Sequence, residues 1–172
     1  ELARLGHLAM HLAREATALG HSSKIFAGES LRLPLYEEGL PVPASVNDMA
    51  EALRGAQGAV IVSPEYNAGI PAHLKNAVDW LSLQRPNPWT GLPVLLASAS
   101  PGAFGGARGL LSWRSVLANV GVWAAPGAIT VPKADVSLGE DGTPVEERAK
   151  LETGRTLERF LSAVERMGGR RL

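Results

Sequence analysis

Apolar residues recur every three or four positions over five stretches of the chain, a spacing that gathers them on one face of a helix. The first predicted helix covers Glu1–Leu19 and ends at Gly20. The other four are predicted over Ser45–Arg54, Pro71–Leu83, Ala107–Val120 and Glu146–Met167. Helices of this kind are stable only when their apolar faces pack against another layer, so a sheet or further helices must cover them.

Short apolar runs lie between these helices and predict strands. The two clearest runs, Gly58–Ser63 and Pro93–Ser98, are apolar at successive positions, as expected for strands that are buried on both faces. Two weaker runs, Lys24–Ala27 and Ala128–Val131, predict further strands. Because helices and strands alternate, we expect crossover connections, a parallel sheet and helices on both of its faces. The prediction is one three-layer α/β domain over residues 1–172.

Two connecting segments are expected to lack regular structure. Pro34 and Pro41 exclude a helix, so Leu31–Tyr36 is expected to form an extended loop. Asp135–Pro144 contains an Asp-Gly pair and a further glycine, which makes it the segment expected to be most mobile.

Composition narrows the class of protein. The 172 residues include 17 Lys and Arg and 17 Asp and Glu, so no net charge attracts nucleic acid or an anionic membrane. The absence of cysteine excludes disulfides and thiol chemistry. The longest strongly apolar run, Ala59–Ser63, is far shorter than the roughly 20 residues that a membrane helix needs. We therefore expect a cytoplasmic protein with neither nucleic acid nor membrane as a partner.

Polar and glycine-rich segments follow the two clearest strands, and parallel sheets bind ligands at such strand ends. After the first strand, Pro64 enforces a turn, and Glu65, Tyr66 and Asn67 present polar and aromatic groups suited to a flat heterocycle. A plain strand-to-helix turn is the alternative for this loop. After the second strand, a serine and glycine-rich loop leads into a helix whose free N–H groups favour an anion or an electron-rich carbonyl.

Side chains elsewhere offer little additional chemistry. His7 and His11 have the spacing of a helical metal pair, but no third ligand accompanies them, so no metal site is expected. Ser63 has no His and Asp partners at a recognisable spacing, which argues against a serine hydrolase. His73 is interpreted as a partly exposed helix residue.

The segment Ser63–Trp80 reads Ser-Pro-Glu-Tyr-Asn-(x)3-Pro-(x)2-Leu-Lys-Asn-Ala-(x)-Asp-Trp. It closely resembles the signature of the NADPH-dependent FMN reductase family, which includes bacterial quinone, chromate and azo-dye reductases and has the flavodoxin-like fold. Ser100–Gly106 resembles the second flavin loop of that family, and Leu33–Tyr36 resembles its loop after the second strand. The likeness extends over essentially the whole chain.

The resemblance implies a cofactor, a reaction and an assembly. One edge of the FMN ring would be held by Pro64, Glu65, Tyr66 and Asn67, and its other side would be approached by Ser100, Gly102, Gly105 and Gly106. NADPH or NADH would supply hydride to FMN, no catalytic side chain would be needed, and electrons would pass to a quinone, azo, flavin or metal-oxyanion acceptor. A homodimer or homotetramer is implied. A flavodoxin-like electron carrier and a cofactor-poor binding relative are the alternatives.

One departure from the family concerns the start of the chain. Family members open with a strand and a phosphate-binding loop, and the helix that follows them corresponds to Glu1–Leu19 here. In the strand order 2-1-3-4-5, that first strand lies inside the sheet. We therefore predict a flavodoxin-like domain that is incomplete at its N-terminus, with a gap between its second and third strands.

Overall fold

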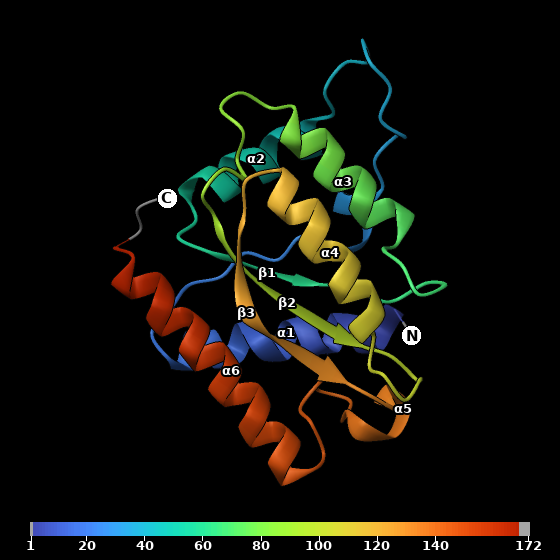
Figure 1. Ribbon diagram of the computed structural model, residues 1–172, viewed down its shortest axis with the longest axis vertical. Coiled ribbons are helices and arrows are strands. Elements are labelled where there is room, and N and C mark those ends of the chain that lie inside the picture. The colour runs from blue at the N-terminus through green and yellow to red at the C-terminus, as the bar shows by residue number, and fades with distance from the viewer. Residues whose placement is uncertain (1, 169–172) are drawn as a thin grey trace.

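The sheet of this protein has three parallel strands. The computed structural model describes residues 2–168, and in it β1 (Ala59–Val62), β2 (Pro93–Ala99) and β3 (Trp123–Val131) lie in the order β1-β2-β3 (Figure 1). β2 is therefore the central strand, and all seven of its residues are buried. This double burial explains why its sequence is apolar at successive positions instead of alternating with polar residues.

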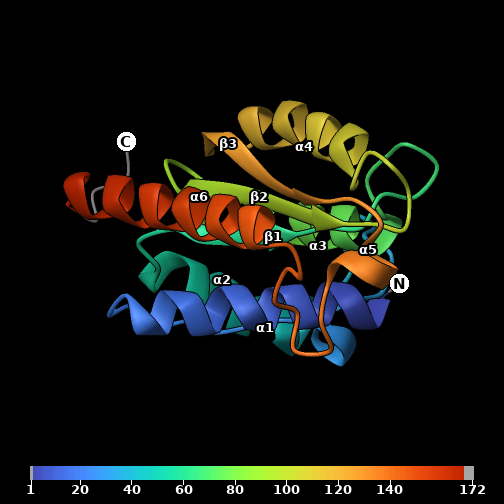
Figure 2. The same cartoon turned by 90° about the horizontal axis from the view of Figure 1, so that it is seen from below.

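Helices cover both faces of the sheet. α1 (Leu2–Ala18) and α6 (Glu147–Arg166) pack on one face. The opposite face is covered by α2 (Ala44–Gly55), α3 (Ala72–Ser82) and α4 (Ala107–Asn119). Figure 1 shows α2, α3 and α4 above the strands and α1 and α6 below them, and Figure 2, seen from below, has α6 in front of the sheet. Two short helices, η1 (Gly28–Leu31) and α5 (Ala134–Ser137), lie within connections. The flavodoxin-like α/β class predicted from the sequence is confirmed.

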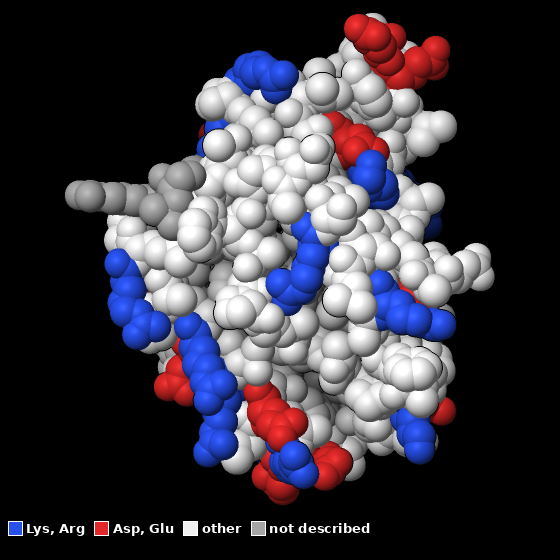
Figure 3. All heavy atoms as spheres, viewed as in Figure 1, with Lys and Arg blue, Asp and Glu red and all other residues white. Residues whose placement is uncertain are grey.

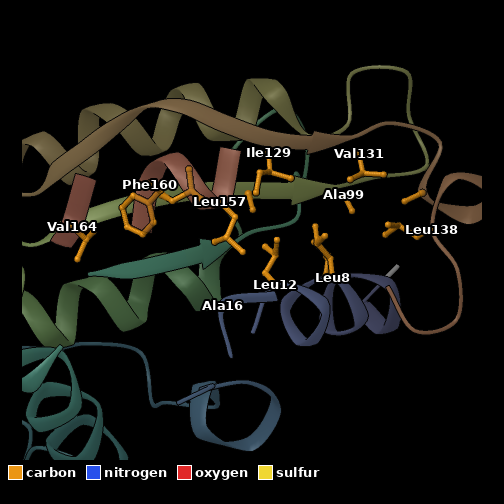
Figure 4. Packing of buried hydrophobic residues seen from close by; sticks show 14 residues of the cluster. Leu8, Leu12, Ala16, Ala99, Ile129, Val131, Leu138, Leu157, Phe160 and Val164 are labelled. Carbon is orange, nitrogen blue, oxygen red and sulfur yellow. The ribbon is translucent and has the colours of Figure 1, made fainter. Parts of the chain in front are cut away.

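Side chains of β2 alternate between two apolar clusters. Leu95, Ala97 and Ala99 belong to the cluster that α1 and α6 complete. Figure 4 shows Leu12 of α1 pointing toward Leu157 of α6 and Leu8 pointing toward Ala99 of β2 in that cluster. Val94, Leu96 and the buried tryptophans of α3 and α4 form the second cluster. The two clusters fix the sheet between its helix layers, because each one removes apolar surface of both a helix and a strand from water.

The strand predicted over Lys24–Ala27 is wrong, since this segment has no regular structure. A strand requires a neighbour to pair with, and a cavity of about 810 Å³ lies between this segment and β1. We call this cavity the β1 groove. Its lining is largely apolar, and it includes Leu12 of α1 and Phe160 of α6. All four residues of β1 are only half-buried, in contrast to β2, because the groove adjoins the strand.

The groove adjoins the outer edge of β1, the side on which the sequence predicts a missing strand. β1 pairs with β2 on one side, and no other described strand pairs with its outer edge. α1 starts at the end of the sheet where the strands finish (Figure 1). A parallel strand in the groove would thus end beside the start of α1, which is the geometry of a strand–helix crossover unit. That the domain is incomplete stays a prediction.

The segment expected to be most mobile, Asp135–Pro144, is held against α1. It contains part of α5, and Leu138 and Pro144 form an antiparallel bridge. Arg4 Nη1 donates to the Leu138 carbonyl at 2.8 Å, and Arg14 Nη2 donates to the Asp141 carbonyl at 2.6 Å. These contacts join positions more than 120 residues apart in the sequence, so a local pattern could not reveal them.

A buried histidine beside this loop predicts a dependence of stability on pH. His11 is 4% exposed, and its Nδ1 lies 3.4 Å from Thr143 Oγ1. The charged groups acting on the ring are Glu15, Arg14, Asp141 and Lys150. Burial lowers the pKa of His11, and the nearby carboxylates only partly oppose this effect. A lowered pKa contributes stability that is present above the unfolded value of about 6.5 and is lost as the pH falls below it.

We therefore expect the free energy of unfolding to fall between about pH 7.5 and about pH 5, and to fall less in a His11→Gln protein. Denaturant unfolding at several pH values measures how steeply the free energy of unfolding changes with pH in the wild type and in His11→Gln. His73→Gln is the matched control, because His73 is exposed on α3. Equal slopes for the wild type and His11→Gln would show that His11 does not cause the dependence.

Candidate functional site

The loops after β1 and β2 converge at the same edge of the sheet. The first loop covers 63–71 and leads into α3, and the second covers 100–106 and leads into α4. Ser63 N–H donates to the Ala97 carbonyl at 2.9 Å, so the first loop begins in register with the end of β2. The carboxyl ends of adjacent parallel strands make such an edge the usual ligand site of this architecture. The two segments that the sequence places after the two clearest strands therefore lie at one edge of the sheet.

The tip of the first loop is a tight turn that exposes Tyr66 and Asn67. Gly69 N–H donates to the Tyr66 carbonyl at 2.9 Å, and Tyr66 N–H donates to the Gly69 carbonyl at 3.3 Å. Asn67 and Ala68 take left-handed conformations, with φ of 51° and 62°, which are the angles of a hairpin turn of this type. Tyr66 is 38% exposed at the tip, whereas Pro64 is buried beneath it.

The glycines of the second loop have two roles: Gly102 leaves backbone exposed, and Gly105 and Gly106 allow the loop to pack closely on its neighbours. Gly102 is exposed, so its backbone is accessible without a covering side chain. Gly105 is buried and left-handed, and a Cβ there would lie 2.7 Å from Pro132 N. Gly106 is also left-handed, and a Cβ there would overlap the Ser98 side chain. Ser100 N–H donates to the Val131 carbonyl at 3.1 Å. The loop thus lies directly on the end of β3.

Glu65 connects the first loop to the start of α4, the helix that follows the second loop. Its side chain is 8% exposed and turns away from the tip of its own loop toward α4. Oε2 accepts the Gly109 N–H at 3.0 Å, and Oε1 accepts Arg108 Nε at 2.9 Å and Nη2 at 2.5 Å. Burial alone would raise the pKa of Glu65, but the hydrogen bonds from Gly109 and Arg108 outweigh it and hold the pKa below its usual value. The carboxylate is therefore ionised at neutral pH.

The sequence model of the NADPH-dependent FMN reductase family matches residues 4–136, which include both loops. The chain belongs to this family. A quinone reductase of Escherichia coli is 42% identical over 119 residues, which make up 63% of this chain and 62% of that protein. An NAD(P)H-dependent FMN reductase of Pseudomonas aeruginosa is 29% identical over 141 residues, or 80% of this chain and 76% of that protein.

Solved structures show the same fold. FerB from Paracoccus denitrificans, named as a flavoenzyme NAD(P)H:(acceptor) oxidoreductase, superposes with a TM-score of 0.81 at 24% identity. The superposition covers 94% of this chain and 90% of FerB. An oxidoreductase of Corynebacterium diphtheriae superposes with a TM-score of 0.60 at 16% identity. At these identities the likeness establishes the fold of this FMN reductase family member and not its substrates.

The second half of the family signature holds another loop in place. Asn76 of α3 accepts the Tyr36 N–H at 2.8 Å through Oδ1 and donates to the Pro34 carbonyl at 2.9 Å through Nδ2. Trp80 Nε1 donates to the same carbonyl at 2.8 Å, and the Trp80 and Tyr36 rings meet edge to face at 5.0 Å. These residues position the segment 33–36, so the signature encodes loop geometry as well as the site.

We expect Asn76→Asp to lower the free energy of unfolding by about 2 kcal/mol. Asn76 is 8% exposed, and the variant replaces its amide donor with a buried carboxylate that faces the Pro34 carbonyl. Urea denaturation measures the loss. Asn47→Asp, at an exposed position near the start of α2, is the matched control and is expected to change the value by less than about 0.5 kcal/mol. Equal losses in the two variants would contradict the role of Asn76.

Three features of the site were not predicted. Ser63 Oγ accepts Trp113 Nε1 at 2.8 Å and donates to the Pro64 carbonyl at 2.9 Å, so it anchors the loop to α4. Gly109 and the direction of Glu65 also become visible only when α4 is packed on the first loop. The available signal was a glycine inside a predicted helix, which is costly unless a neighbour approaches closely.

The exposed part of the site combines an aromatic side chain with backbone that no side chain covers. Tyr66 offers an aromatic face, and Gly102 offers backbone without a side chain. Glu65 adds no unpaired charge, because Arg108 pairs with it. Among the described residues, no group of three His, Cys, Asp or Glu side chains is placed to hold a metal ion. None of the helices between residues 2 and 168 combines the length and the apolar composition that a membrane crossing requires.

Proposed function

We propose that this chain is a flavin-dependent oxidoreductase that takes hydride from NADPH or NADH and passes electrons to a small-molecule acceptor. The observation that carries the proposal is the convergence of two loops, both within the family match, at the carboxyl edge of a parallel sheet. Bound FMN would supply the redox chemistry, as cofactors do in such enzymes. The protein would bind the FMN and orient it toward its substrates.

The eight proposed cofactor-binding residues divide into two groups by exposure. Tyr66, Asn67, Ser100 and Gly102 are exposed or half-exposed, and these residues would touch the ring. Pro64, Glu65, Gly105 and Gly106 have buried side chains or buried backbone, and they would shape the loops from behind. N–H groups of the loop backbone would face the electron-rich edge of the ring, where fixed dipoles stabilise negative charge without reorganising.

The proposed acceptor is a quinone, an azo compound, a free flavin or a metal oxyanion, and it would use the cleft after the nicotinamide leaves. The name of the Escherichia coli relative, a quinone reductase, makes a quinone the first compound to test. We further propose a homodimer or homotetramer in the cytoplasm. The family resemblance supports this assembly, since a neighbouring subunit commonly completes the flavin cleft in such proteins.

The test is direct. Protein titrated with FMN should quench flavin fluorescence, and the complex should oxidise NADPH when a quinone is added. A parallel titration with riboflavin measures what the phosphate contributes to binding. Tyr66→Ala should weaken the binding of both flavins, because both share the ring that Tyr66 would contact. Failure of the wild-type protein to bind either flavin would refute the proposal.

A flavodoxin-like electron carrier is the second candidate. It would bind FMN but would be reduced only by a separate reductase and not by NADPH directly. Such carriers have strongly acidic surfaces, whereas this chain balances 17 acidic against 17 basic residues. On the face shown in Figure 3, acidic and basic side chains are mixed. The charge distribution therefore favours the enzyme. A cofactor-poor relative would bind no flavin in the titration above.

We also propose that an extended strand, placed before α1 and parallel to β1, completes the domain in the β1 groove. The outer edge of β1 and the apolar lining of the groove support this occupant. Joining a short valine-rich strand and a flexible loop ahead of Glu1 should raise the free energy of unfolding by a few kcal/mol, since several side chains become buried. A glycine–serine extension of equal length is the control. Equal stability of the two proteins would contradict the proposal.

A further inference from the structure

We infer that Glu65 is a positioning residue whose carboxylate couples the loop 63–71 to the start of α4 and so sets the spacing of the two flavin loops. Glu65 then acts on the flavin without touching it. The inference rests on the proposed function, because it concerns loops proposed to hold FMN. It changes the role that the family resemblance suggests for this residue, which is direct contact with the ring.

The contacts of the carboxylate leave little of it for a ligand. One oxygen accepts the Gly109 N–H, and the other accepts two N–H groups of Arg108. The side chain is 8% exposed, so a bound ring could reach it only if the loop moved. Charge-assisted hydrogen bonds of this kind are the strongest available to a carboxylate, and they oppose such movement.

The carboxylate also replaces a missing cap on α4. The N-cap residue of this helix is Gly106, which has no side chain with which to accept the free N–H groups. Gly109 is the third residue of α4, and a capping side chain normally satisfies an N–H at that position. Glu65 satisfies it from 44 residues away in the sequence, and its negative charge lies at the positive end of the helix dipole. The helix that follows the second loop is thus capped by a residue of the first loop.

A close approach of backbones sets the same spacing independently. A Cβ on Gly109 would lie 3.2 Å from the Gly69 carbonyl oxygen and 3.4 Å from Glu65 Cβ. Any larger residue at this position would push the first loop away from α4. Glycine weakens a helix relative to alanine, so its presence in the first turn of α4 is explained by this approach.

Arg108 extends the coupling into the second loop. Its guanidinium lies 5.5 Å from the centre of the Phe104 ring, while its Nε and Nη2 bind Glu65. Phe104 is 66% exposed in the glycine-rich loop. One cation therefore contacts both loops, through an ion pair on one side and an aromatic ring on the other.

The experiment is a double-mutant cycle of Glu65→Gln and Arg108→Met, with the FMN dissociation constant as its readout. Glu65→Gln keeps an acceptor for Gly109 but removes the ion pair. Each single variant should weaken FMN binding by about tenfold, and the double variant should bind FMN no more weakly than the weaker single variant. If Glu65 instead contacted the flavin directly, Glu65→Gln would weaken FMN binding by the same factor in the wild-type protein and in Arg108→Met.

Two further measurements separate positioning from general instability. At saturating FMN, the visible circular dichroism of the bound flavin should change in Glu65→Ala and be restored toward the wild-type signal in Glu65→Gln, because the amide oxygen still caps α4. The control cycle uses Arg148 and Glu152, an exposed ion pair on α6, and should alter neither the dissociation constant nor the dichroism. Additive losses in the Glu65 and Arg108 cycle, or an unchanged dichroism in Glu65→Ala, would overturn the inference while the proposed function stands. Absence of flavin binding by the wild-type protein would end both.

Discussion

A Gly142→Ala protein is expected to lose about 3 kcal/mol or more of its free energy of unfolding and to melt about 10 °C lower. Gly142 has φ of 82°, a conformation that an alanine adopts only with strain. A Cβ there would also overlap the His7 carbonyl group of α1, and backbone of a packed helix cannot move aside cheaply. The loop 138–144 would therefore separate from α1.

Thermal and urea unfolding measure this effect. Gly6→Ala is the matched control on α1, because nothing lies within 4 Å of a Cβ at that position. It is expected to leave the free energy of unfolding unchanged or raise it by up to about 1 kcal/mol, since alanine stabilises a helix relative to glycine. If Gly142→Ala is as stable as Gly6→Ala, the loop does not need its close packing on α1.

Gly105→Ala is expected to affect the proposed flavin site most strongly. Its Cβ would lie 2.7 Å from Pro132 N and 2.8 Å from the Val131 carbonyl carbon, both of which are backbone atoms at the end of β3. Its φ of 56° adds strain. The loop 100–106 must then lift from β3. We expect a loss of about 2–4 kcal/mol in stability and at least a tenfold loss in FMN affinity.

Gly102→Ala separates the effect on FMN affinity from the effect on stability. A Cβ at Gly102 would meet only Ser100 Oγ, at an ordinary distance of 3.5 Å, so stability should stay within about 0.5 kcal/mol of the wild type. Its FMN affinity should nevertheless fall, because the new methyl group would stand where the ring approaches the backbone. If Gly105→Ala kept both its stability and its affinity for FMN, the loop would not depend on close contact with β3.

The fold was predictable where burial shapes the sequence. β1 lies inside the run Gly58–Ser63, and β2 covers the run Pro93–Ser98 and extends one residue further, to Ala99. β2 is apolar throughout because it is buried on both faces. β3 was only half predicted. Its first half contains Pro126, which cannot donate to a ladder, and the register of the pair shifts there. Arg114 of α4 donates to the Ala125 and Pro126 carbonyls, a contact that no local pattern contains.

The site was predictable to the level of its loops. Topology alone brings the ends of β1 and β2 together, and the family signature identified which loop residues to examine. The direction of a side chain was not predictable. Glu65 turns toward α4 because its carboxylate binds Arg108 and Gly109, which lie 43 and 44 residues further along the chain. Asn76 and Trp80 likewise reach a loop more than 40 residues before them. Such contacts follow from packing and not from spacing.

The outer edge of β1 has a practical consequence. Ala59, Val60, Ile61 and Val62 carry no charge and no proline, two of the devices by which proteins protect exposed strands from joining other molecules. Whenever this edge stays open, we expect purified samples to aggregate through intermolecular strand pairing as they are concentrated.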